Sequence, residues 1–497
     1  MEWIKLRVVM KFLVRQYMIK ELTGNLDETI LEIMRTINKN ALGVCFIVNQ
    51  DGIFDGVVTD GDIRRAILSH KELTSPINDI VNRNCIYGYI DDSSEILVNK
   101  INETFGRNSD TQISILPLLD NNKKLVDYFR YSTVTHFPVA IPNLAGNELK
   151  YLTDAFLSTW ISSSGTYLDL FEDQFSTYSD CKHGIAVSNG TVAIHLALVV
   201  LGIGEGDEVI VPDLTFAATI NAVLHARATP VIVDIEAESW CIDPDEIENA
   251  ITSKTKAIIP VHLYGQVCNM DKIMKIAKKY KLKVIEDCAE AHGATFNNKK
   301  VGSLGDIGCF SFFGNKVLTT GEGGMCTTKS SLLNEKLRIY RDHGMSKDKK
   351  YYHEVVGFNY RMTNLQAAIG VAQLERIDEI HKGRSSYETL YRKALSGQSF
   401  EFQKNLKDRQ RITWLVSFLT NGSKDQLIEK FKNNGIEART FFLPLSTMKI
   451  YKKYSAKVNP VAQKLSNNGI SLPTYESLKS LEEIELILNN ILKSKYD

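Results

Sequence analysis

The sequence has no excess charge of either sign and no long hydrophobic run. Its 497 residues include 59 basic and 59 acidic side chains, so the formal net charge is zero. This balance argues against the strongly basic surface with which proteins bind nucleic acid, and we expect no nucleic-acid partner. No apolar run approaches the roughly 20 residues that a membrane-spanning helix needs, so we expect no membrane segment.

The chain also lacks any Cys-x-x-Cys pair. Its eight cysteines are scattered, and several lie in apolar runs such as GCFSFF, where a buried thiol is the ordinary state. This pattern is typical of a protein of the reducing cytosol and indicates neither a disulfide framework nor a metal site. The basic, apolar start MEWIKLRVVMKFLVRQYMIK resembles a secretory signal, but lysines and arginines interrupt its apolar runs. We interpret it as a strand or amphipathic lead-in and expect a cytoplasmic protein.

The length of the chain predicts two or three domains. Residues 1–134 read as a small α/β unit, in which LGVCFIV and FDGVVTDGD are strands around the turn NQDG and IRRAILSH is a helix. A weaker copy of the strand–turn–strand pattern, QISILPLLDNNKKLVDYF, follows about 70 residues later and suggests an internal repeat.

Beyond that unit, apolar strands alternate with amphipathic helices. VIVPDLTFAATINAVLHARATPVIVDIE reads as strand, helix and strand, and AIIPVHLYG, MDKIMKIAKKYKL and KVIED repeat the alternation. This order predicts an α/β fold with a mostly parallel sheet that is covered by helices on both faces. After about Gly370 the pattern loosens into helices and an α+β tail ending in LEEIELILNNILKSK. We therefore expect a large domain at 135–375 and a small C-terminal domain at 376–497.

A candidate phosphate site lies in AVSNGTVAIHLAL, where Gly190 and Thr191 stand between an apolar strand and the start of a helix. Backbone N–H groups at a helix N-terminus bind phosphate readily, and glycine allows the close approach. A plain helix cap is the simpler alternative, because Asn and Thr are favoured there in any case.

Two further candidates are a carboxylate and a lysine. KVIEDCAEAHGA places Asp287 at the carboxyl end of a short strand, the edge at which open α/β sheets bind ligands, although a turn or cap would also explain it. Lys316 follows the strand-like IGCFSFF and precedes TTGEGGM. Shielding from water disfavours an ammonium group, which leaves a free amine that can attack a carbonyl. A lone lysine of this kind is nevertheless more often a surface cation.

Together these features describe one cofactor, pyridoxal 5′-phosphate. This cofactor needs a phosphate cradle, a lysine for a Schiff base, and a carboxylate on its pyridinium nitrogen. Phe216, in DLTFAATINAV, adds an aromatic ring that can stack on the cofactor, with core packing as its alternative.

In the order of its motifs the sequence resembles the DegT/DnrJ/EryC1/StrS family of pyridoxal phosphate-dependent sugar aminotransferases, from about Ile141 to the C-terminus. The resemblance implies the fold-type I architecture, a mostly parallel sheet sandwiched by helices with a small C-terminal α+β part. The matching motifs are WISSSGTYLDLFE, SNGTVAIHLAL, GDEVIVPDLTFAATINAV, PVHLYGQ, EDCAEAHGA, FSFFGNK, TGEGGM and GFNYRMTNLQAAIG.

The resemblance gives the matched residues roles around the cofactor. Lys316 would form the Schiff base and move the proton during transamination, and Asp287 would pair with the pyridine nitrogen. The other contacts that it implies are Glu290 at the phenolic oxygen, Gly190, Thr191 and Ser311 at the phosphate, and Phe216 on the ring.

The resemblance also places residues near the substrate and at a subunit boundary. Asn359, in GFNYRM, would reach the phosphate of a neighbouring subunit, which implies a homodimer with shared active sites. His343, in RDHG, and Arg439, in ARTFFLPL, are candidates near the substrate. A helix end or a salt bridge would explain these two residues equally well.

The identity of Lys316 bears on the reaction. A dehydratase branch of the family carries histidine there and removes a hydroxyl group, so lysine favours amine transfer. The resemblance implies L-glutamate as donor and a nucleotide-linked 4-keto-6-deoxyhexose as acceptor, giving a 4-amino-4,6-dideoxy sugar for surface polysaccharide such as O-antigen. WISSSGTYLDLFE and FSFFGNKVLTTGEGGM are most similar to family members that convert GDP-4-keto-6-deoxymannose to GDP-perosamine. UDP- or dTDP-linked 4-keto sugars, 3-keto sugars, sugar dehydration and a non-catalytic nucleotide sensor are the alternatives.

In the first unit, FDGVVTDGDIRRAIL resembles a CBS domain. In nucleotide-binding CBS modules the positions of Thr59 and Asp62 meet ribose hydroxyls, so the resemblance implies one possible nucleotide site in a CBS pair at 1–134. The weaker copy, KKLVDYF, lacks both residues. A structural or dimerising module is an equal alternative, since DGDIRRAIL also reads as an Asp-started helix with exposed arginines.

Overall fold

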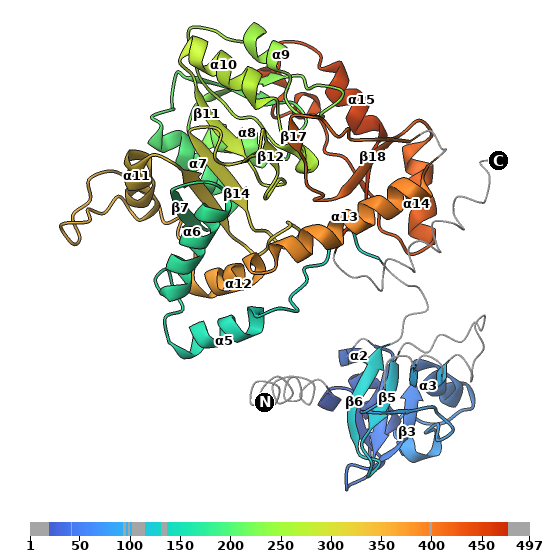
Figure 1. Ribbon diagram of the computed structural model, residues 1–497. Helices are drawn as coiled ribbons and strands as arrows, with labels where there is room; N and C mark the ends of the chain where they lie inside the picture. The colour runs from blue at the N-terminus through green and yellow to red at the C-terminus, as the bar shows by residue number, and fades with distance from the viewer. Residues whose placement is uncertain are drawn as a thin grey trace. The chain divides into compact units, whose positions relative to one another are not determined.

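The computed structural model describes residues 19–40, 42–92, 96–97, 100–101, 115–130, 137–396 and 400–475. The chain divides into two compact units, Met1–Thr135 and His136–Asp497 (Figure 1). Residues 1–18 of the expected lead-in and the run LEEIELILNNILKSK lie outside the described residues. Within the described ranges, no helix has the length and apolar character needed to cross a bilayer.

The first unit is built from short strands and helices. In chain order these are β1 (Thr23–Asn25), α2 (Ile30–Asn40), β2 (Val44–Val48), β3 (Phe54–Thr59), α3 (Asp60–Leu68), η1 (Ile77–Asp79), β4 (Gly88–Tyr89), β5 (Ile115–Leu119) and β6 (Leu125–Arg130). The strands form two sheets of three, and in each the first two strands are parallel and the last two antiparallel.

The two antiparallel hairpins of this unit have matching turns. Asn49 and Asp120 each accept, through a side-chain oxygen, hydrogen bonds from the backbone N–H groups two and four residues later. Each turn then passes through a left-handed residue, Gly52 at φ 76° and Lys123 at φ 61°. The strand–turn–strand repeat predicted from the sequence is therefore present.

The second unit begins with a large α/β part. Its elements are α5 (Glu148–Leu157), α6 (Thr166–Tyr178), β7 (His183–Val187), α7 (Gly190–Val200), β8 (Glu208–Pro212), α8 (Ala218–His225), β9 (Thr229–Val233), α9 (Pro244–Asn249), β10 (Thr255–Ile258), η2 (Leu263–Gly265), α10 (Met270–Tyr280), β11 (Lys283–Asp287), β12 (Thr295–Phe296), β13 (Lys299–Lys300), β14 (Ile307–Ser311), β15 (Gly324–Thr328), α11 (Ser331–Arg341) and α12 (Asn364–Leu374).

A seven-stranded sheet in the order β7-β15-β14-β11-β10-β8-β9 forms the centre of this part. Only β15 among its strands runs against its neighbours, so the mostly parallel sheet predicted from the sequence is confirmed. Side chains alternate between the two faces: in β8, Val209 and Val211 pack with α7, α8 and α11, whereas Ile210 packs with α6, α10 and α12. Each such buried side chain contributes about 1.5–3 kcal/mol.

The C-terminal part is smaller and α+β. Its elements are α13 (Ile377–Ala394), β16 (Phe400–Phe402), β17 (Arg409–Gln410), β18 (Val416–Thr420), α14 (Lys424–Asn433), β19 (Arg439–Thr440), η3 (Leu445–Thr447), η4 (Lys452–Tyr454), α15 (Pro460–Asn468) and β20 (Gly469–Leu472). Strands β16, β18, β20 and β19 form an antiparallel sheet. The long helix α13, orange in Figure 1, leads from α12 to this part.

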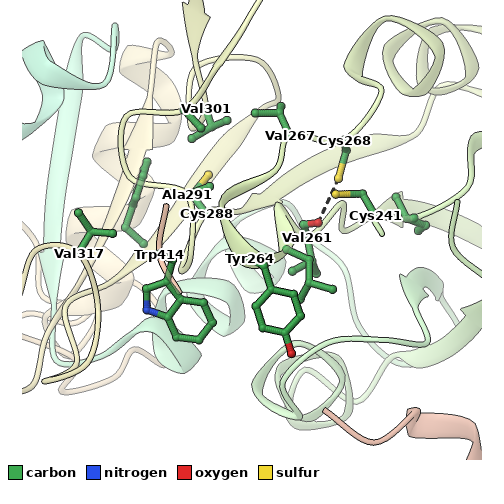
Figure 2. Packing of buried hydrophobic residues seen from close by; sticks show 14 of the residues in the cluster. Cys241, Val261, Tyr264, Val267, Cys268, Cys288, Ala291, Val301, Val317 and Trp414 are labelled. Atoms are coloured by element: carbon green, nitrogen blue, oxygen red, sulfur yellow. Dashed lines mark hydrogen bonds between the residues drawn. The ribbon is translucent and has the colours of Figure 1, made fainter. Parts of the chain in front are cut away.

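Side chains of the large part and of the segment before β18 share one core. Figure 2 shows Tyr264 of η2 beside Trp414, with Val261, Cys268 and Cys288 packed nearby. The two aromatic rings are stacked, with centroids 5.9 Å apart and planes at 14°. This aromatic contact ties the C-terminal part to the carboxyl edge of the central sheet.

Candidate active site

A cavity of about 860 Å³ lies at the carboxyl ends of the parallel strands. Thr215 follows β8, Val261 follows β10, Asp287 ends β11 and Ser311 ends β14, and all four line it. The first turn of α7 closes one side. Open α/β sheets bind their ligands at this edge, so the topology itself marks the cavity as the candidate site.

Lys316 is held in this cavity by the connection between β14 and β15. The connection is closed by backbone hydrogen bonds from Phe312 N–H to the Gly323 carbonyl (2.8 Å) and from Thr320 N–H to the Phe312 carbonyl (3.0 Å). The Lys316 side chain is 12% exposed, and its Nζ lies 3.7 Å from Glu290 Oε1. The sequence predicted a shielded amine, and the structure supplies that shielding together with a carboxylate partner.

Glu290 is a buried carboxylate with an unusual protonation equilibrium. Burial raises its pKa to about 7, against the opposing effects of the Lys316 charge and of a hydrogen bond from the backbone N–H of Tyr264. That N–H donates to Glu290 Oε2 over 2.9 Å. Near neutral pH the Glu290 carboxyl group can therefore hold or release a proton beside the lysine.

Asp287 is also buried at the cavity edge. The Thr219 hydroxyl donates to its Oδ2 (2.8 Å) and the Ala289 N–H donates to its Oδ1 (3.2 Å). Burial raises the pKa of Asp287, and these two hydrogen bonds oppose the rise. The carboxylate is thereby fixed in orientation and prepared to accept a positively charged N–H group.

Helix α7 and strand β14 approach each other closely at Gly190. The Asn189 side chain accepts the N–H of Val192 (3.0 Å) and so caps the helix. A Cβ atom on Gly190 would lie 2.7 Å from the Cβ of Ser311, a distance that side chains do not tolerate. Glycine therefore lets the helix N-terminus and the Ser311 hydroxyl share one concave surface, with Thr191 beside them.

Phe216 and Arg439 line the same cavity. Phe216 is 61% exposed, and its ring lies 5.9 Å from that of Phe442. Phe216 therefore presents a free aromatic face to the cavity rather than filling the core. The Arg439 guanidinium donates to Glu437 Oε1 over 2.8 Å. Arg439 therefore forms a salt bridge and also lines the cavity.

Asn359 and His343 do not line this cavity. Both contact Arg361, whose Nε donates to Asn359 Oδ1 (3.0 Å) and whose NH2 lies 3.3 Å from His343 Nε2. The third guanidinium nitrogen of Arg361, NH1, donates to Asp342 Oδ1 (2.7 Å). The roles expected for Asn359 at a neighbouring subunit and for His343 near the substrate stay predictions.

In the first unit, Thr59 and Asp62 form the start of α3. The Thr59 hydroxyl donates to Asp62 Oδ2 (2.6 Å), and each side chain also accepts the backbone N–H of the other. This reciprocal arrangement is a capping box, which stabilises the helix start. Arg65 bonds the second oxygen of Asp62. The nucleotide contact expected of these two residues stays a prediction.

Four residues near the lysine were not assigned a role from the sequence. Thr219 orients Asp287, and Tyr264 and Trp414 surround the lysine and Glu290. His292 donates from Nε2 to the Ser311 carbonyl (2.9 Å), and burial, aided by the Lys316 charge, lowers its pKa to about 3, so it stays neutral. These four residues are Thr219, Tyr264, His292 and Trp414. Three of them lie in the quoted motifs, whereas the segment around Trp414 carries no recognisable signal.

One group of potential metal ligands occurs among the described residues, formed by His262, Glu286 and Cys288. Its nitrogen and oxygen atoms already have partners. His262 Nε2 donates to Glu286 (3.1 Å), and His262 Nδ1 accepts the N–H of Cys268 (3.2 Å). Glu286 further accepts three backbone N–H groups. These bonds indicate a structural role for the three residues, of which Glu286 and Cys288 flank Asp287 in the chain.

The fold and the site define an α/β enzyme with a shielded lysine, two buried carboxyl groups and a helix N-terminus around one cavity. Residues 142–492 match the DegT/DnrJ/EryC1/StrS aminotransferase family, and residues 14–69 match the CBS domain. The chain belongs to the DegT/DnrJ/EryC1/StrS aminotransferase family, with a CBS domain at its N-terminus.

Individual relatives agree with this assignment. The chain is 43% identical over 358 residues to the GDP-perosamine synthase of Escherichia coli O157:H7, a match covering 72% of this chain and 98% of that protein. It is 45% identical over 353 residues to the GDP-perosamine synthase of Caulobacter vibrioides, covering 70% and 95%. The protein Spr1654 of Streptococcus pneumoniae, solved in its PLP form, superposes with a TM-score of 0.68 at 27% identity, covering 72% of this chain and 98% of that one.

Proposed function

We propose that this chain transfers the amino group of L-glutamate to GDP-4-keto-6-deoxymannose, with pyridoxal 5′-phosphate as cofactor, and so makes GDP-perosamine. The observation that carries the proposal is the meeting of Lys316, Glu290 and Asp287 in one cavity. The choice of sugar is supported by the similarity to two GDP-perosamine synthases at 43% and 45% identity.

The residues of the cavity fit this cofactor. The close approach of Gly190 to Ser311, which any Cβ would prevent, leaves backbone N–H groups and a hydroxyl for a phosphate. Asp287 offers a fixed carboxylate for a pyridinium N–H, and Lys316 offers an amine. When bound, pyridoxal phosphate supplies an aldehyde that takes up the amino group and a ring that withdraws electrons.

In this proposal the chain's own groups bind, orient and move protons. Lys316 would hold the cofactor covalently through Nζ, and the same amine, once free of the cofactor, would carry a proton. Glu290, whose pKa is raised to about 7 by burial, holds a second proton 3.7 Å away. Tyr264 and Trp414 are buried and keep water from this side of the lysine.

The test is a product assay with L-glutamate and the GDP-, UDP- and dTDP-linked 4-keto-6-deoxyhexoses. We expect an amino sugar and consumption of glutamate with the GDP-linked substrate, and preference for another nucleotide would correct the substrate. A deoxygenated sugar formed without glutamate consumption would identify a dehydratase instead. Protein purified without the yellow absorbance of bound pyridoxal phosphate would favour a nucleotide sensor.

The assignment of Lys316 as the cofactor lysine is tested by the variant Lys316→Ala. Because the amine is the only covalent anchor proposed, this variant should lose the yellow absorbance and at least about a thousandfold of the transamination rate. The exposed Lys336→Ala, on α11, is the control and should keep both. An unchanged spectrum in Lys316→Ala would contradict the assignment of the lysine.

We further propose that two copies of the chain form a homodimer in the cytoplasm, with sites shared between subunits. An apolar stretch at the end of α5, including Phe156, Leu157 and Trp160, is exposed in the single chain and offers a surface for a second copy. Asn359 lies outside the cavity of its own subunit, which fits a contact made across a boundary. The complementation experiment in the Discussion tests this arrangement.

A further inference from the structure

The amine of Lys316 faces an aromatic ring as well as a carboxylate. Its Nζ lies 4.2 Å from the centroid of the Trp414 ring, within the range of a cation–π contact. Trp414 is 3% exposed, so the contact is shielded from water. A carboxylate and an aromatic face both attract an ammonium group, and here both contact the same amine.

Trp414 is fixed at both its side chain and its backbone. The indole Nε1–H donates to the Asn315 carbonyl (2.9 Å), directly before the lysine in the chain. The Trp414 carbonyl accepts a hydrogen bond from Arg384 NH1 (2.7 Å), and Arg384 NH2 donates to the Lys316 carbonyl (3.4 Å). These bonds lock the ring to the lysine loop, so the ring cannot turn away without breaking them.

Tyr264 supports the ring and the carboxylate together. Its ring lies beside that of Trp414 (Figure 2), nearly parallel to it, and its N–H donates to Glu290. Tyr264 adopts the left-handed conformation (φ 51°, ψ 32°), which is unfavourable for an aromatic residue. Such strained residues occur where the surroundings fix them at functional sites. Here the strained backbone places Tyr264 against both Trp414 and Glu290, the two groups that contact the lysine amine.

We propose that Trp414 is a positioning residue, whose indole face holds the Lys316 amine beside Glu290 and stabilises its charged form. The proposal rests on the proposed function in taking Lys316 as the cofactor lysine. Removal of the ring frees the amine to move and to lose its proton more easily. The charged, titratable and aromatic groups around the amine are Glu290, Asp287, His292 and Trp414, and Arg384 binds the backbone carbonyl of the same lysine.

The test compares the reactivity of Lys316 in the full-length, cofactor-free chain. Trace acetylation with acetic anhydride, followed by peptide mass spectrometry, gives the rate at Lys316 relative to exposed lysines of the same sample. In Trp414→Leu we expect the rate near neutral pH to rise between about twofold and about thirtyfold, which is the range of a partly to fully desolvated cation–π contact. Trp414→Phe, which keeps a weaker ring, should lie between wild type and Trp414→Leu.

Greater access of the reagent would also raise the rate, so the pH profile is decisive. Access alone scales the rate equally at every pH, whereas loss of the contact moves the midpoint of the profile to lower pH. The control is Trp240→Phe, because Trp240 lies in the same aromatic cluster, 6.4 Å from Tyr264. We expect the wild-type profile for this control.

An unmoved midpoint in Trp414→Leu overturns the proposal. If that variant does not fold, a Trp414→Phe profile equal to that of Trp240→Phe overturns it. Failure of the proposed function is a separate result, because it would appear as yellow absorbance retained in Lys316→Ala whatever the acetylation profiles show.

Discussion

Replacement of Glu290 by glutamine should make the cofactor-free protein more stable above neutral pH. Burial raises the pKa of Glu290 from its usual 4.5 to about 7, even though Lys316 and the Tyr264 N–H favour the carboxylate. In the unfolded chain the group returns to its usual value. Glutamine has a similar shape and accepts the same N–H, but it has no proton to lose.

The expected magnitude follows from the two pKa values. Between about pH 4.5 and pH 7 the folded protein holds a proton on Glu290 that the unfolded chain has released, so the free energy of unfolding falls as pH rises through this window. One pKa unit corresponds to about 1.4 kcal/mol, which gives a loss of about 3 kcal/mol in wild type by pH 8. A loss of this size is a large fraction of the 5–15 kcal/mol that is usual for whole domains. Glu290→Gln should not show it.

The assay is urea unfolding at pH 5 and pH 8, followed by the fluorescence of Trp160, Trp240 and Trp414 in the second unit. The gain of Glu290→Gln over wild type should be about 1 kcal/mol at pH 5, just above the unfolded-state pKa, and about 3 kcal/mol at pH 8. Glu205→Gln removes an exposed carboxylate, 74% accessible, and should show no such difference. Equal gains at the two pH values would refute the reasoning.

Two other predictions concern the cofactor site and the subunit boundary. Gly190→Ala, at the first residue of α7, overpacks Ser311 at a cost of about 1–3 kcal/mol. The unfolding midpoint of this variant should therefore fall slightly. Its dissociation constant for pyridoxal phosphate, measured by absorbance titration, should rise at least about tenfold. The control is Gly204→Ala, because a Cβ atom at Gly204 would meet nothing nearer than 3.6 Å. Lys316→Ala and Asn359→Ala, unfolded and refolded together, should recover about one quarter of wild-type activity if sites are shared, because half of the dimers are mixed and one of their two sites is intact. No recovery above the separate variants would contradict shared sites.

The parts of the site that the sequence predicted share a local signal. Gly190, Asp287 and Lys316 each lie at or just beyond the end of an apolar strand, and parallel strands bring such ends to one edge of the sheet. The direction of β15 was not predicted from its residues, GMCTT. The absence of a helix between β14 and β15 could have indicated it, since a parallel pair needs a longer crossover.

The remaining part of the site depends on contacts that are distant in the sequence. Trp414 reaches Lys316 from the segment before β18, and Arg384 reaches both from α13. Nothing in ITWLVSF distinguishes this tryptophan from one that only fills a core. Its role follows from tertiary packing, which no local pattern of hydrophobic or turn residues encodes.

The hairpin that carries Lys316 has a consequence for protein engineering. Both of its strands, β14 and β15, lie inside the sheet, and its loop is closed by its own backbone bonds. The stretch between Lys347 and Lys350 follows the hairpin in the chain and is exposed. New chain ends opened there, or a reporter domain inserted there, would leave Asp287 and Lys316 on one continuous segment, so the reactive amine keeps its anchorage while the connectivity around it is redesigned.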